Sequence, residues 1–371
     1  MMAIHVLPDR DPDGGTSVGY LLAHGRSAAA FALLAGVGLA LATARVRTAP
    51  EHAGVGAGIA VRGLAIGAIG LALGYPDSGV AVILPYYAMF FLLAVPLLRL
   101  RAGALAGLAL VVAGVVPVVS HLLRGSLPPA DTANPTFATL IQDPVRLVVE
   151  LALTGYYPVL AWMTYLCAGL AVGRLPLRST RVAVVLLGGG AALALAASSA
   201  SWFLLDVLGG REQIAANLSF TDPGEVDRML SESQYGVTPT TTWWWLSVAS
   251  PHSSTPFDLL HTTGTALALL GAALLVARAA EWALVPLAAA GGMTLTLYTG
   301  HVLLLASPVL PADPTTSYLI QVAAVLMLAT AWRAVVRRGP LEEAVAVLAV
   351  AARRAVTSRW RGSDLEHVEH P

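Results

Sequence analysis

Apolar segments long enough to cross a bilayer recur along the whole chain, and this pattern limits the fold more than any other feature. Of the 371 residues, 56% are hydrophobic and only 12% are charged, whereas a soluble domain is about a quarter charged. A bilayer core offers no hydrogen bonds to the backbone, so such segments cross it as helices. The sequence therefore predicts an all-α fold, a polytopic transmembrane helix bundle.

We expect about nine to ten membrane spans. Nine full spans are predicted near 21–43, 57–75, 80–99, 103–123, 147–172, 182–207, 257–278, 283–306 and 316–336. Residues 1–6 look like the end of a further span, so we expect that the sequence is missing most of a first span. The alternative is a genuine short N-terminal segment. We expect no signal peptide, because the segment lacks the basic region and the longer apolar region of one.

The arginines orient these spans. All 22 basic residues are arginine; fifteen fall in alternate loops and the C-terminal segment, and six on the opposite side. The positive-inside rule makes the fifteen cytoplasmic. Residues 1–338 then form the transmembrane domain, with a long external loop at 208–256. Residues 339–371 form a cytoplasmic, amphipathic and basic tail that we expect to lie along the anionic inner leaflet.

Composition also limits location and partners. Heavy use of Ala, Gly, Val and Leu, with arginine as the sole basic residue, is typical of a GC-rich bacterial genome. We therefore expect a multi-pass protein of the bacterial cell (inner) membrane. The net charge of zero argues against a nucleic-acid partner, and the expected partner is the lipid bilayer.

The segment from Gly291 to Ala306, GGMTLTLYTGHVLLLA, carries a polar stripe through a predicted span. Thr294, Tyr298 and His301 are spaced i, i+4 and i+7, so they lie on one face of a helix. Polar groups in a span face the protein interior or a wet cavity, because lipid contact is costly. His301 is the group there that can move a proton near neutral pH.

Further polar residues fall at similar depth near the predicted external side. The predicted catalytic residues are His301, His5 and Tyr298, and the predicted substrate-binding residues are His24, Arg26, Tyr156 and Tyr157. Such a cluster is typical of a site that binds an anionic or hydroxylated ligand and handles a proton. Interfacial capping and snorkelling are the alternative. Glu150 is expected to be interfacial.

On the inner half of its span, Arg62 is a candidate for binding cofactor phosphates, or else it snorkels to the interface. Gly169 and Gly173 form a small-xxx-small pair that, with Gly36, predicts close helix packing. No Walker, nucleophile-elbow, H-E-x-x-H or cysteine-cluster motif occurs, so we expect no metal.

Several blocks resemble known bacterial membrane proteins. Gly25 to Leu41, Ile83 to Leu98, Thr154 to Leu175 and Arg337 to Val345 are similar to blocks of YeiB-type proteins. The run GGMTLTLYTGHVLLL resembles the penultimate block of heparan-alpha-glucosaminide N-acetyltransferase-like proteins. That resemblance implies a multi-pass acyltransferase that moves an acetyl group from acetyl-CoA across the membrane.

The sequence thus predicts a membrane acyltransferase that takes an acetyl or similar acyl group from acyl-CoA to a hydroxyl or amine of an external glycan or lipid. His301 or His5 would be the general base, and Arg26 would bind a negative group or the developing oxyanion. Two alternatives remain. A transporter would use the same polar cavity, although the sequence shows no inverted repeat and no matching pair of broken helices. The other alternative is a non-catalytic membrane protein.

Overall fold

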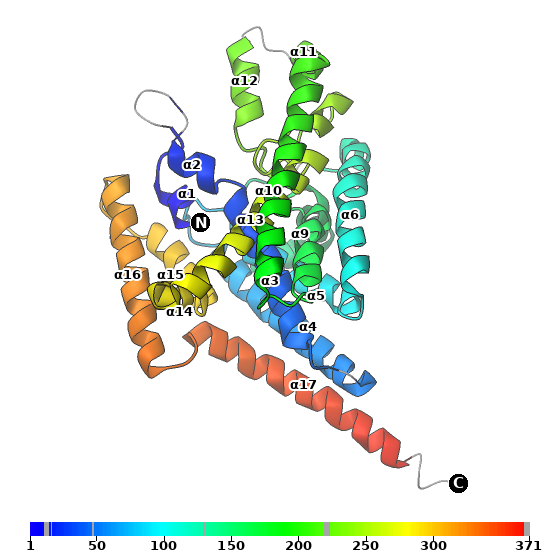
Figure 1. Cartoon of the computed structure of the whole chain (residues 1–371), viewed down its shortest axis with the longest axis vertical. Coiled ribbons are helices and arrows are strands. Elements are labelled where there is room, and N and C mark those ends of the chain that lie inside the picture. The colour runs from blue at the N-terminus through cyan, green and yellow to red at the C-terminus, as the bar shows by residue number, and fades with distance from the viewer. Residues whose placement is uncertain (11–14, 16, 47, 129–130, 219–222, 367–371) are drawn as a thin grey trace.

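The computed structural model describes residues 1–10, 15, 17–46, 48–128, 131–218 and 223–366. Within these ranges all regular secondary structure is helical (Figure 1). The predicted all-α fold is confirmed.

The helices in the first half of the chain are, in order, α1 (Met2–Val6), α2 (Val18–Ala23), α3 (Arg26–Thr43), α4 (Ala49–Leu73), α5 (Leu84–Leu97), α6 (Ala102–Leu123), η1 (Arg124–Ser126), α7 (Phe137–Gln142), α8 (Pro144–Val149), η2 (Glu150–Thr154) and α9 (Val159–Val172). Four consecutive longer helices, α3 to α6, thus have short helices before and after them, and α9 follows.

Short elements also interrupt the second half. They are α10 (Thr180–Trp202), η3 (Phe203–Val207), α11 (Gly210–Ala216), α12 (Pro223–Ser231), η4 (Trp243–Ser247), α13 (Pro256–Ala279), η5 (Glu281–Leu284), α14 (Val285–Gly291), α15 (Thr294–Leu305), α16 (Pro314–Val335) and α17 (Pro340–Glu366).

Fewer helices qualify as membrane spans than the sequence predicted. Among the described residues, six helices are long and apolar enough, and the number rises to eight if each of two bent helix pairs is one span. The expectation of nine to ten spans is therefore slightly too high. The difference lies in α5, an apolar helix shorter than a typical span, and in α1, which has only five residues.

Two of the helix pairs are bent, although the sequence indicated no matching pair of broken helices. The pair Pro144–Thr154 and Val159–Val172 bends by 56°, and the pair Glu281–Gly291 and Thr294–Leu305 bends by 66°. The first break follows a π-helical turn and ends at Pro158, which lacks a backbone donor. Such breaks at functional sites are common in membrane proteins.

Helix α9 forms the centre of the bundle, and α3, α5, α6 and α13 pack around it. Thirteen of its residues are buried. It meets α3 at a glycine contact, where a Cβ on Gly169 would overlap the carbonyl oxygen of Leu33 and one on Gly36 would overlap that of Leu166. Gly173 likewise lies against Val37. The prediction of close packing at these three glycines is confirmed.

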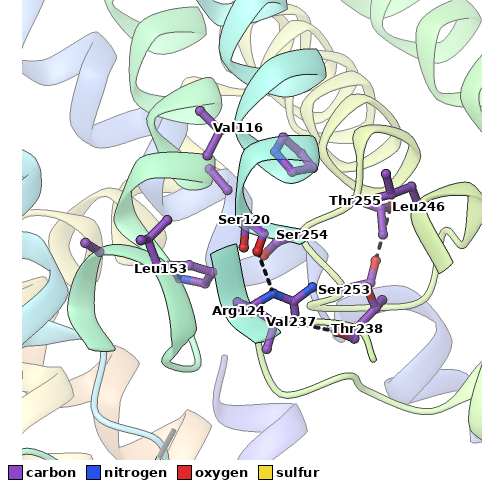
Figure 2. Close-up of a pocket in the computed structure, with 14 residues that line it drawn as sticks. Val116, Ser120, Arg124, Leu153, Val237, Thr238, Leu246, Ser253, Ser254 and Thr255 are labelled. Atoms are coloured by element: carbon purple, nitrogen blue, oxygen red, sulfur yellow. Dashed lines mark hydrogen bonds between the residues drawn. The ribbon is translucent and has the colours of Figure 1, made fainter. Parts of the chain in front are cut away.

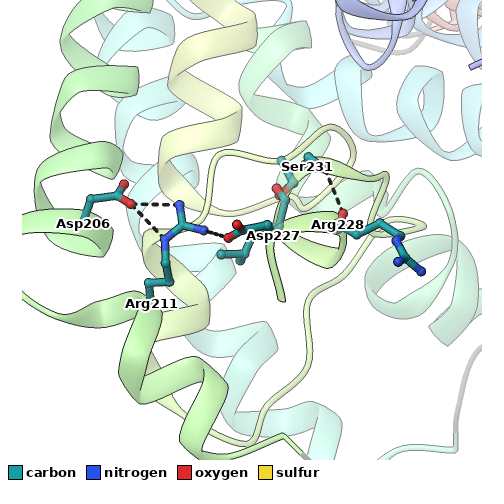
Figure 3. A network of polar contacts seen from close by, with 7 residues as sticks. Asp206, Arg211, Asp227, Arg228 and Ser231 are labelled. Carbon is teal, nitrogen blue, oxygen red and sulfur yellow. Dashed lines mark hydrogen bonds and ion pairs between the residues drawn. The ribbon is translucent and has the colours of Figure 1, made fainter. Parts of the chain in front are cut away.

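Helices α11 and α12 extend from the bundle on the side opposite α17 (Figure 1). They are joined by Arg211, whose guanidinium pairs with Asp206 at 2.8 Å and with Asp227 (Figure 3). Beneath them, Trp245 of η4 is fully buried and packs with Leu205 and Ile214. The segment predicted to be an external loop, 208–256, thus contains packed helices in its described part.

Helix α17 packs along α4 and fixes the start of α15. It lies against Gly54 and Gly58 of α4, and its residues Arg353 and Thr357 are the neighbours of Gly54. Its Glu342 accepts hydrogen bonds from the backbone nitrogens of Leu295 (2.7 Å) and Thr296 (3.1 Å). A carboxylate at a helix N-terminus satisfies donors that the helix itself leaves free.

Candidate functional site

The predicted residues His5 and His301, 296 positions apart, are in direct contact. Nδ1 of His5 lies 3.0 Å from Nε2 of His301, and the two rings are stacked with centroids 5.3 Å apart. His301 is buried, and about two helical turns separate it from the Glu342-capped end of α15. The structure therefore pairs two of the three predicted catalytic residues.

His5 lines a cavity of about 570 Å³, a volume within the range of small-molecule sites. Its wall includes His5, His24, Tyr86, Asn134, Glu150, Tyr156, Tyr157, Tyr235 and His252. Four of the predicted site residues thus share one cavity. Asn134 stiffens this wall, since its side chain bonds the backbone of Val80 and Val82, at 2.8 Å each.

The cavity is acidic and aromatic. Asp77, Asp131 and Glu150 line it, and no arginine is among the described residues that do so. A wall of this sign repels anions. Of the two ligand classes that the sequence left open, the lining favours the hydroxylated one, and tyrosine rings offer it stacking surfaces and hydroxyl partners.

Sequence reasoning assigned Glu150 to the interface, whereas the structure buries it in this wall. The residue is 8% exposed, begins the π-helical turn η2, and makes no side-chain hydrogen bond that the described residues record. The side chain lies where a Cβ on Gly155 would meet it. No spacing signal pointed to this burial, because the π-helical turn that re-aims the residue is not apparent from a continuous apolar run.

His252, in the loop before α13, was also missed. Its ring stacks on that of Trp162 at 5.8 Å and meets His24 edge-on at 5.3 Å. Its backbone adopts a positive φ of 56°, as do Tyr235 (49°) and Ser254 (51°). Non-glycine residues in this region are uncommon and cluster at binding and catalytic sites. This loop therefore belongs to the candidate site.

The burial of His252 predicts acid sensitivity. Burial lowers its pKa from 6.5 to about 3, and burial also lowers the pKa of the facing His24. Below pH 6.5 the unfolded state binds a proton at this histidine that the folded state does not bind. The contribution of His252 to the free energy of unfolding is therefore fully present above pH 6.5 and is lost as the pH drops toward 3. We expect the thermal midpoint to fall by a few degrees or more between pH 7 and pH 5.

His252→Asn should flatten this dependence, because asparagine tolerates a positive φ and does not titrate. Thermal unfolding of the detergent-purified protein at several pH values checks this, with His52→Asn as the control on α4. An equal slope in wild type and His252→Asn would show that His252 is not responsible.

Arg124 links α6 to the segment before η4 (Figure 2). Gly236 of that segment donates its backbone N–H to the carbonyl oxygen of His252 at 2.8 Å. The Nε of Arg124 donates to the carbonyl of Ser120 at 3.3 Å, and another guanidinium nitrogen donates to the carbonyl of Thr238. The hollow around it, also lined by Ser253 and Ser254, measures about 10 Å³, about enough for one water molecule. Arg124 thus connects α6 to the segment between α12 and η4.

The predicted ligand-binding residue Arg26 lies elsewhere. Its Nε is 3.3 Å from Nε2 of His261, whose Nδ1 lies 2.7 Å from the Oγ of Ser198. A guanidinium only donates, so Nε2 accepts and Nδ1 carries the proton. His261 therefore cannot take a proton from Ser198, which excludes an activated serine in this arrangement.

Tyr298 lies beside His301 on a second hollow, an apolar groove of about 410 Å³ that Thr294 also lines. The predicted shared face of these three residues is confirmed. The Tyr298 hydroxyl accepts from the backbone nitrogen of Ile83 at 3.3 Å, so it supports the start of α5. Arg62 is exposed on α4, within electrostatic range of Arg338 and Glu342.

Metal ligands do not converge in the part of the chain that the structure describes, where no group of three or more His, Cys, Asp or Glu residues could hold an ion. The chemistry available to the described site is proton transfer by the histidine pair and binding by carboxyl, tyrosine and amide groups.

These features define a class: a multi-pass helical membrane protein with a polar site enclosed among its helices. The sequence model of the heparan-alpha-glucosaminide N-acetyltransferase catalytic domain matches residues 9–205, more than half of the chain. The chain belongs to this acetyltransferase-like membrane protein family, and the predicted resemblance to it is confirmed. The resemblance to YeiB-type proteins stays a prediction. No curated protein and no solved structure matches the chain.

Proposed function

We propose that the protein is a membrane acyltransferase that moves an acetyl or similar acyl group from acyl-CoA to a hydroxyl or amine of an external glycan or lipid. The observation that carries the proposal is the pair of His5 and His301, 3.0 Å apart, with His5 on the wall of the 570 Å³ cavity. The acceptor would occupy that cavity, against the wall to which Tyr156, Tyr157, His24 and His252 contribute.

One histidine of this pair can take up and return the proton that the reaction moves. The acceptor's oxygen or nitrogen attacks the thioester carbonyl carbon, its proton passes to a histidine, and the carbon–sulfur bond breaks. The thiolate of coenzyme A then takes the proton from the histidine. A neutral imidazole can accept the proton in the first transfer and return it in the second.

Arginines at the inner side fit the other substrate. Coenzyme A is polyanionic, and Arg62 and Arg338 are exposed near the inner end of the bundle that we assign to the cytoplasm. They would bind its phosphates. This orientation places α17 in the cytoplasm and α11 and α12 outside, in a bacterial inner membrane.

Binding of acetyl-CoA to the detergent-purified protein tests the donor. We expect saturable binding of acetyl-CoA and of free coenzyme A, weakened several-fold in Arg62→Ala and unchanged in Arg146→Ala, an exposed arginine on α8. Transfer of radiolabelled acetyl from acetyl-CoA to glucosamine, a probe with both hydroxyls and an amine, tests the reaction. A folded protein that binds no acetyl-CoA would rule the proposal out.

A transporter is the second candidate, because both bent helix pairs are of the kind that line transport sites. The polar cavity lies at the first break, where Tyr156 and Tyr157 connect η2 to α9. Flux of glucosamine into proteoliposomes without acyl-CoA would favour this candidate. The acyltransferase proposal expects no such flux.

A further inference from the structure

His301 lies between two side chains, and only one of them was predicted. Its Nε2 faces His5, and its Nδ1 lies 2.8 Å from Oε1 of Gln321 on α16. Nε2 of Gln321 in turn donates to Oγ of Ser317 at 3.1 Å. Gln321 is 2% exposed and Ser317 3%, so this chain of hydrogen bonds is enclosed.

Helix α16 buries little else. In its 22 residues only Ser317, Gln321 and Ala329 are buried, and the helix stands at the edge of the bundle (Figure 1). Two of its three buried side chains are therefore the polar pair behind His301. Burying polar groups costs free energy unless they are hydrogen-bonded, so a buried pair on an otherwise peripheral helix needs a reason beyond packing.

The amide orientation fixes the protons of both histidines. With its nitrogen on Ser317, Gln321 presents a carbonyl oxygen, which only accepts, so Nδ1 of His301 carries the proton. Neutral His301 then accepts at Nε2, and Nδ1 of His5 must donate to it. The remaining nitrogen of His5, Nε2, is left without a proton.

We propose that Gln321 is a positioning residue that holds His301 and His5 in their Nδ1–H forms and so makes Nε2 of His5 the proton acceptor. Turning the amide over would reverse every bond in the chain and leave a proton on Nε2 of His5. The catalytic meaning of this inference rests on the proposed acyltransferase function; the tautomers themselves do not.

The test is ¹⁵N NMR of the full-length protein with labelled histidine at a pH where the rings are neutral. His5→Asn and His301→Asn identify the two rings by the signals they remove. In wild type we expect both rings to show a protonated Nδ1 and an unprotonated Nε2. In Gln321→Met the signals of both rings should move toward values averaged between the two tautomers.

The Gln321→Glu variant, unlike Gln321→Met, should show the same histidine tautomers as wild type, because a carboxylate also accepts from Nδ1 of His301. Thr330→Val, elsewhere on α16, is the control for general disturbance and should change neither ring. A protonated Nε2 on His5 in wild type would overturn the inference without need of any variant, as would unchanged spectra in a folded Gln321→Met protein.

The same variants separate this inference from the proposed function. If the spectra respond to Gln321 and no acetyl transfer occurs, the positioning role stands and the acyltransferase proposal falls. If acetyl transfer occurs in wild type and the spectra contradict the tautomers, the acyltransferase proposal stands and the positioning role of Gln321 falls. If both stand, Gln321→Met should lower kcat more than it raises KM, and Gln321→Glu should recover part of the loss.

Discussion

Replacing His5 by asparagine should lower the rate of acetyl transfer by about 10²- to 10⁴-fold, the range for loss of a general base. Asparagine retains a side-chain donor near the position of Nδ1, so it can still face Nε2 of His301, the partner at 3.0 Å. It has no nitrogen that accepts a proton at neutral pH. The loss should therefore appear in kcat, with acetyl-CoA binding largely preserved.

Initial rates with acetyl-CoA and glucosamine, together with acetyl-CoA binding, measure this effect. His52→Asn is the matched control, because His52 lies at the start of α4 and its ring bonds the backbone of Thr48, far along the chain from His5. His301→Asn should also lose activity, since it removes the partner that orients His5. A folded His5→Asn protein with wild-type kcat would exclude His5 as the base.

The residues of the site were predictable one at a time, but not their pairing. His5 and His301 stood out because an ionisable group among apolar residues is costly wherever it lies. Nothing in their spacing joins positions 296 residues apart. Their contact depends on how α1 and α15 pack, which the hydropathy of each segment does not determine.

Gln321 and His252 were missed for different reasons. Gln321 has a partner four residues away in Ser317, and that i, i+4 polar pair in an apolar helix could have indicated a buried face. His252 lies in a loop, where a histidine is unremarkable in sequence. Its burial depends on the positive-φ backbone of its own loop and on a hydrogen bond from the backbone nitrogen of Gly236 to its carbonyl oxygen.

Most long helices were predictable because lipid-facing and buried surfaces are both apolar, so length alone marks them. The breaks within two of the predicted spans were not predictable. Residues 144–172 and 281–305 read as single apolar runs, yet they bend by 56° and 66°. Hydropathy averages over a window and is insensitive to a π-helical turn or to the Gly292–Met293 step that separates α14 from α15.

Substituting leucine for Gly169 should destabilise the protein severely, by about 3 kcal/mol or more. The new Cβ would overlap the carbonyl oxygen of Leu33, a backbone atom that cannot rotate away as a side chain can. Relief requires α3 and α9 to separate along the core. Because α9 contacts most of the central helices, the loss should spread through the bundle.

Thermal unfolding and the yield of monodisperse protein after detergent extraction measure this loss. Gly188→Leu on α10 is the matched control, because it makes the same change within a helix where nothing lies within 4 Å of the new Cβ. It should leave the midpoint nearly unchanged. Equal midpoints for the two variants would mean that α3 and α9 do not cross at Gly169, and the arrangement that places His24 beside the cavity would need revision. A collapse confined to Gly169→Leu would instead tie the stability of the whole bundle to one backbone contact in its core.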